Sequence, residues 1–181
     1  MPVRPRPFRS KLLWMLPVLL WTLLVFHWSH QSFREQSIQP LLHKLFTKEE
    51  IHDYIPQVTV RYHHTIIRAQ SDPMRFIEFI FRKTAHLVVY AVLAALAHQA
   101  LSFWRSRRRK RMIFSLLYVV VIAMGDEWVQ SAAAMRTSAI QDVVLDTAGG
   151  LAGLSAAVWA VPWGIRLWRT SSLIKRREAG R

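Results

Sequence analysis

The chain lacks cysteine, and its acidic residues are few, with 11 aspartates and glutamates against 25 lysines and arginines. The missing thiols exclude a disulfide framework and any thiolate metal site. No internal repeat, dedicated nucleophile motif or HExxH-type metalloprotease motif occurs in the 181 residues. The basic surplus gives a net charge of +14, which would suggest nucleic acid as a partner if the charges formed one surface.

Long apolar runs are what the sequence has instead, with 52% hydrophobic residues and eight tryptophans. A helix needs about 20 residues to cross about 30 Å of hydrocarbon. Four runs come close to that length: residues 12–28, 84–104, 112–131 and 143–163. The third does so only by continuing past its uncharged part, 112–124. These runs predict an all-α polytopic membrane protein, a bundle of about four transmembrane helices with an outer segment, 29–83, between the first two.

The basic residues lie in three segments that flank the predicted spans: residues 1–11, 105–111 and the tail, 164–181. With four spans, all three segments fall on one side of the membrane. The positive-inside rule places that side, with both termini, in the cytoplasm. The charge therefore indicates topology and argues against a nucleic-acid partner. The first run is followed by no small-x-small cleavage site, which favours an uncleaved anchor over a signal peptide.

The outer segment contains three local signals. Thr47 and Glu50 in "TKEEIHDYI" have the spacing of a capping box and predict the start of a short helix. The β-branched stretch "QVTVRYHHTII" predicts extended structure or a short strand. Asp72 and Pro73 predict the N-cap and first residue of a helix that continues into the second span.

Ionisable and amide side chains gather at the outer ends of the second, third and fourth spans. A charge alone in hydrocarbon costs at least about 2.5–3.5 kcal/mol, so these groups must face each other, water or a ligand. We expect them to converge into one polar site, or into an ion-paired network that only joins the helix ends. The predicted site consists of Arg82, Lys83, His86, Asp126, Glu127, Gln130, Arg136, Asp142 and Asp146.

Three glycines continue the helical face that carries Asp142 and Asp146. Gly149 and Gly153 form a small-xxx-small pattern, and Gly150 lies between them. Such a pattern lets another transmembrane helix approach closely, so these three glycines are predicted to serve helix packing.

The spaced stretches "RKTAHLVVY", "DEWVQ" and "QDVVLDTAGGLAG", with Arg136 six residues after Gln130, resemble the VanZ-like family of bacterial membrane proteins. The resemblance covers most of the chain, makes residues 12–163 a VanZ-like membrane domain, and implicates Lys83, His86, Glu127, Gln130, Arg136, Asp142, Asp146 and Gly149. Two departures are Ala134-Met135, where the family often has Pro-Gly, and Asp146, where many members have Asn. The resemblance implies a bacterial cell membrane location and a link to resistance to teicoplanin, a lipid-tailed antibiotic, but no reaction.

Two functions remain open on these grounds. In the first, the outward-facing site engages a lipid-linked or amphiphilic envelope molecule, with Arg82, Lys83 and Arg136 meeting phosphate or carboxylate, and lowers sensitivity to lipoglycopeptides such as teicoplanin. In the alternative, the protein is an intramembrane enzyme acting on a lipid headgroup, with His86, Glu127 and Asp142 as catalytic candidates. A histidine with two or three carboxylates could hold a hard cation, but neither a metal nor a cofactor is assigned. A structural scaffold is the plainer option, and a transporter is disfavoured for want of a broken-helix repeat. Membrane lipid is the expected partner, and the oligomeric state stays open.

Overall fold

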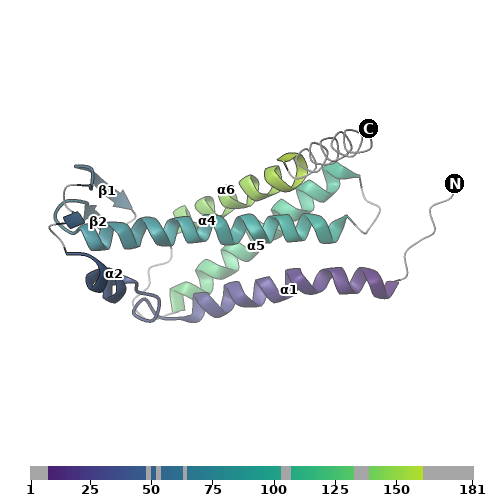
Figure 1. Cartoon of the computed structure of the whole chain (residues 1–181). Helices are drawn as coiled ribbons and strands as arrows, with labels where there is room; N and C mark the ends of the chain where they lie inside the picture. Colours follow the sequence, from purple (N-terminus) through teal and green to yellow (C-terminus); the bar gives the residue numbers. More distant parts are fainter. Residues whose placement is uncertain are drawn as a thin grey trace, which may run out of the picture.

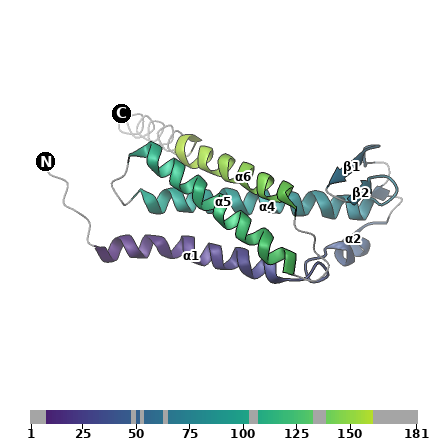
Figure 2. The same ribbon diagram turned by 180° about the vertical axis from the view of Figure 1, so that it is seen from behind.

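The structure, a computed structural model, describes residues 8–47, 50–51, 54–62, 65–102, 107–132 and 139–160. Four helices run side by side in alternating directions (Figure 1). They are α1 (Phe8–His30), α4 (Pro73–Leu101), α5 (Arg108–Ala132) and α6 (Ile140–Ser155), which continues as the π-helix η1 (Ala156–Ala160). Figures 1 and 2 place α1 on one side of α4 and α5, and α6 on the other. The predicted basic N-terminus (apart from the start of α1), the whole tail, 164–181, and Arg136 lie outside the described residues.

Among the residues that the structure describes, three helices are long and apolar enough to cross a membrane: Leu13–His30, Pro73–Leu101 and Arg108–Ala132, with mean hydropathies of 1.3, 1.5 and 1.7. The third exceeds its predicted run, 112–131, whereas the first begins one residue after the predicted start at 12 and the second ends at Leu101 instead of 104. Their outward faces are covered with large apolar side chains, such as Leu20, Leu23, Leu117 and Val121, which are at least half exposed. A hydrophobic exterior is what a bilayer requires of a helical bundle. The prediction of an all-α polytopic membrane protein is confirmed.

The predicted fourth span corresponds to α6 and η1, which are helical over residues 140–160. With 16 residues, α6 alone is about 24 Å long, less than the hydrocarbon thickness of about 30 Å. The last residues of this run, 161–163, lie outside the described part of the chain. A fourth crossing therefore remains a prediction.

Two glycines hold α6 close to its neighbours, Gly149 against the backbone of α4 and Gly150 against a side chain of α5. A Cβ on Gly149 would lie 2.5 Å from the carbonyl oxygen of Leu87, and one on Gly150 would lie 2.7 Å from Cγ1 of Val119. These distances are too short for any side chain. The glycines thus let α6 lie directly on α4 and α5, which sets the height and rotation of its acidic face.

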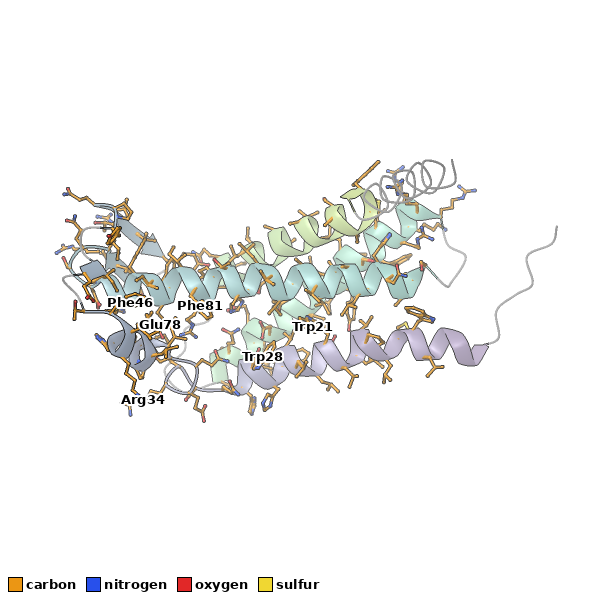
Figure 3. The ribbon with its side chains drawn as sticks, viewed as in Figure 1. Trp21, Trp28, Arg34, Phe46, Glu78 and Phe81 are labelled. Atoms are coloured by element: carbon orange, nitrogen blue, oxygen red, sulfur yellow. The ribbon has the colours of Figure 1, made fainter. Side chains whose placement is uncertain are left out.

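Side-chain contacts attach α1 to the same bundle. Nε1 of Trp21 donates a hydrogen bond to the carbonyl oxygen of Val89 on α4, at 3.0 Å. Figure 3 shows Trp21 between the two helices. The hydroxyls of Thr22 and Tyr118 lie 2.8 Å apart and join α1 to α5. Both hydrogen bonds join protein groups directly and can form inside a bilayer. Thus α1 can be part of the folded bundle as well as a membrane anchor.

A small layer covers one end of the bundle, which we call the hairpin end. It contains α2 (Gln39–Leu45) and the antiparallel strands β1 (Thr59–Tyr62) and β2 (Thr65–Arg68), with Val60 paired to Ile67 (Figure 1). The predicted strand region is confirmed as this hairpin. It is the one departure from all-α structure among the residues described.

Both predicted helix starts are confirmed. The backbone N–H of Thr47 donates to Oε2 of Glu50 at 2.8 Å, and the N–H of Glu50 donates to Oγ1 of Thr47 at 3.3 Å, as in a capping box. Asp72 caps α4 by accepting from the N–H of Arg75 at 3.3 Å, and Pro73 follows it. The helix that begins there runs without interruption into the second span.

A buried glutamate ties α2 to α4. Glu78 is 2% exposed and accepts hydrogen bonds from the backbone N–H of Ile38 at 3.1 Å and from Nε2 of Gln39 at 2.7 Å. Figure 3 shows Glu78 on the side of α4 that faces α2. The sequence assigned no such role to Glu78, because its partners lie about 40 residues earlier and share no spacing pattern with it.

Candidate functional site

Eight of the nine predicted site residues converge at the hairpin end. There α4 begins, α5 ends and α6 begins, so alternating helix direction brings their polar turns together (Figure 1). Five of the eight are at most 7% exposed: Asp126, Glu127, Gln130, Asp142 and Asp146. Arg136 lies outside the described residues, so its place in the site stays a prediction.

The first group of contacts centres on Asp142. Its Oδ1 pairs with the ammonium of Lys83 and accepts a hydrogen bond from the hydroxyl of Tyr62 at 2.5 Å. The Lys83 ammonium also lies 4.2 Å from the centre of the Tyr62 ring. Burial and the Asp142 carboxylate raise the pKa of Tyr62, so this hydroxyl remains a donor. Tyr62 belongs to β1, and no sequence spacing connected it to this site.

The second group of contacts links side chains of α4, α5 and α6. Nδ1 of His86 lies 3.0 Å from Oδ1 of Asp146. Oδ2 of Asp126 accepts hydrogen bonds from the hydroxyl of Tyr90 at 2.9 Å and from Nε2 of Gln130 at 3.2 Å. The rings of His86 and Tyr90 stack at 6.5 Å on one face of α4. This group is the deepest part of the site, since Asp146 has no exposed surface.

Glu127 has a different position from the other carboxylates. Its Oε2 accepts from the backbone N–H of Ala139 at 2.8 Å, directly before α6. The positive N-terminal end of the α6 dipole also stabilises a carboxylate at this position. These contacts give Glu127 a part in fixing the start of α6.

Two adjoining clefts border the cluster. The first, of about 370 Å³, lies between α1, the residues after α1, α4 and α5. Its apolar lining includes Val25, Trp28, Phe81 and Val89, and its polar lining includes His86, Tyr90, Asp126 and Gln130. Trp28 and Phe81 are 39% and 55% exposed, so the apolar side of this cleft is accessible from outside the bundle (Figure 3).

The second cleft, of about 400 Å³, lies between the hairpin, α4 and the start of α6. Three cations line it, Arg75, Arg82 and Lys83, with Asp142 and Glu78 opposite in charge. The guanidinium of Arg82 also lies 4.4 Å over the ring of Phe33, which holds it in place. Three residues line both clefts: Arg82, His86 and Gln130. The two spaces therefore meet at these side chains.

An apolar helical bundle that buries a charged cluster at one end is an integral membrane protein with a polar site. Residues 13–161 match the VanZ/LLP1 family, and the chain belongs to that family. No curated protein and no solved structure matches the chain. The family resemblance inferred from the motifs between residues 82 and 153 is thus confirmed.

Proposed function

We propose that this VanZ-like protein binds the anionic headgroup of a lipid-linked or amphiphilic envelope molecule at the outer face of the bacterial cell membrane. The observation that supports this proposal is the meeting of the two clefts at Arg82, His86 and Gln130. One cleft offers apolar surface and the other offers cations. An amphiphile presents the same two chemistries side by side.

The apolar part of the first cleft suits a hydrocarbon tail. Trp28 of α1 and Phe81 of α4 are exposed and Val89 of α4 lines the same cleft, so a hydrocarbon chain can enter along this apolar side from the bilayer. Ligand sites typically combine such apolar lining with a few polar groups that orient the ligand.

The cations of the second cleft suit phosphate or carboxylate. Arg82 can donate two parallel hydrogen bonds to either group. Lys83 has three N–H donors and gives at least one to Asp142, which leaves it donors for a ligand while Asp142 holds it in place. The binding of an anion here also offsets the cost of the positive charges.

The charge distribution supports an outward orientation. The basic residues from Arg107 to Arg111 lie at the start of α5, at the end of the bundle opposite the hairpin. By the positive-inside rule that end faces the cytoplasm, and the clefts face outward. Outer-leaflet headgroups and antibiotics from outside the cell would then reach them.

The test measures both binding and phenotype. A susceptible bacterium expresses the wild type, Arg82→Gln or Arg68→Gln, and teicoplanin tolerance is compared at equal membrane abundance. Arg68 is the matched control because it is exposed on β2 and lines neither cleft. Binding of teicoplanin and of a polyprenyl phosphate to the purified full chain is measured in parallel.

We expect Arg82→Gln to weaken binding of at least one of these two amphiphiles at least 10-fold, and Arg68→Gln to leave it unchanged. If Arg82→Gln is absent from the membrane, Arg75→Gln replaces it, because Arg75 is exposed and lines the second cleft. Unchanged binding in the cleft variants, or none in the wild type, would contradict the proposal. Binding without a change in tolerance would retain the site and exclude the teicoplanin phenotype.

A lipid-headgroup enzyme is the second candidate, favoured by the 3.0 Å contact between His86 and Asp146. A carboxylate on one ring nitrogen orients a histidine as a general base. A product that forms when purified protein is mixed with lipid extract, and disappears with His86→Ala, would establish this function in place of simple binding.

A further inference from the structure

Three side chains from three different helices meet at the base of the second contact group. His86 of α4, Asp126 of α5 and Asp146 of α6 each offer one ligand atom, and these atoms all lie within 4.8 Å of one another. The three residues are far apart in the sequence and form no metal-binding motif. Only the packing of α6 on α4 and α5 brings them together.

Two oxygens of this cluster are buried without a hydrogen-bond partner in the described structure. They are Oδ1 of Asp126 and Oδ2 of Asp146, whose residues are 2% and 0% exposed. A buried carboxylate oxygen without a partner is strongly disfavoured, and here two such carboxylates lie close together. Each of them already accepts a hydrogen bond at its other oxygen. The two remaining lone oxygens thus indicate a missing positive ligand.

We propose that a divalent cation, Mn²⁺ or Zn²⁺, binds between His86, Asp126 and Asp146. Imidazole and carboxylate together suit these two ions, whereas softer ions need sulfur ligands. On binding, the ion would displace the proton between Nδ1 of His86 and Oδ1 of Asp146, whose 3.0 Å separation is that of two ligands about 2.1 Å from one ion at a right angle. Opposite ligands of such an ion lie about 4.2 Å apart, so the widest pair needs to close by roughly 0.6 Å at most.

The ion would connect the cluster to the first cleft. His86 and Asp126 both line that cleft, so an anionic headgroup there lies next to the positions of the ion that the protein does not fill. Phosphate oxygens bind such positions readily. The metal site itself does not depend on the proposed ligand, because it is defined by protein groups alone and is measured without lipid.

The experiment uses the full chain purified in detergent, stripped with EDTA and then titrated with MnCl₂ or ZnCl₂. Bound metal is counted by mass spectrometry after desalting, and the dissociation constant and unfolding temperature are measured. Asp146→Asn is the test variant. Asp72→Asn is its matched control, since it removes the same charge from an exposed residue that caps α4 and lines neither cleft.

We expect about one ion per wild-type chain, a rise in the unfolding temperature with metal, and at least a 100-fold weaker affinity in Asp146→Asn. Asp72→Asn should keep its affinity within about threefold. Without metal, Asp146→Asn should unfold at a temperature no lower than the wild type, because the change removes one of two repelling charges.

Two results would overturn the proposal. One is a wild type that binds neither ion at 1 mM, about the weakest affinity consistent with a resident metal. The other is binding that Asp146→Asn and Asp72→Asn weaken equally. If Asp146→Asn does not fold, Asp126→Asn takes its place under the same criteria. The metal titration tests only the metal site, and amphiphile binding by metal-free protein tests only the proposed function. A failure of one proposal can therefore be distinguished from a failure of the other.

Discussion

Gly153 of α6 lies so close to Ala91 of α4 that a Cβ on Gly153 would be 2.0 Å from the Ala91 carbonyl oxygen. The contact is between two backbones, so no side-chain rotation can relieve it. This distance determines how near α6 comes to α4, and with it the position of Asp142 and Asp146 in the site.

Gly153→Ala should therefore destabilise the fold. Excess volume in a packed interior costs about 1–3 kcal/mol, and the upper part of that range applies because backbone must move. Unfolding in mixed detergent micelles measures the loss. The control is Gly125→Ala, where the new Cβ would lie 3.3 Å from the ring of Phe26, a side chain that can shift. Equal losses in the two variants would show that the α4–α6 contact is looser than described.

The ion pair of Lys83 and Asp142 should behave as one unit in a double-mutant cycle. Lys83→Met or Asp142→Asn alone removes one partner and leaves the other charge in a poorly hydrated place, which costs about 2 kcal/mol of unfolding free energy. The double variant should lose at least about 1 kcal/mol less than the sum of the two single losses. Simple additivity would mean that water or another group replaces the missing partner.

Glu78→Gln should loosen α2 while the bundle stays folded. The amide can keep one acceptor, but its N–H₂ group then faces a donor, either the N–H of Ile38 or Nε2 of Gln39. Hydrogen exchange should become at least 10-fold faster in Gln39–Leu45 and remain unchanged in α5. Unchanged protection of α2 would show that its docking depends on apolar contacts instead.

The absence of cysteine allows a direct test of orientation. Tyr54→Cys places one thiol at an exposed position near the hairpin end, and Arg109→Cys places one at the start of α5. A membrane-impermeant maleimide should label Tyr54→Cys in intact spheroplasts and Arg109→Cys only after permeabilisation. The reverse pattern would place the clefts on the cytoplasmic side and contradict the proposed access from outside.

Much of the bundle could be predicted from local sequence signals. Span lengths follow from apolar runs, and the starts of α4 and of the helix after Thr47 follow from capping residues whose partners are three residues away. The meeting of the carboxylates was also predictable, because polar turns at the same ends of neighbouring antiparallel helices must lie together. The sequence could not assign each carboxylate to its partner, because the pairing depends on how each helix is rotated about its axis.

The sequence by itself thus determined a membrane-embedded helical bundle with polar residues collected at one end, because hydrocarbon thickness and the cost of buried charge act on every residue independently of its distant neighbours. Tertiary structure alone decided that Asp142 pairs with Lys83 and Tyr62, that Glu127 faces the start of α6, and that Asp146 meets His86 beside Asp126. Those pairings follow from the glycine contacts of α6 and from the hairpin over α4. The contacts of α6 with Lys83, His86 and Tyr62 join residues 59, 60 and 80 positions apart, and no local pattern encodes them.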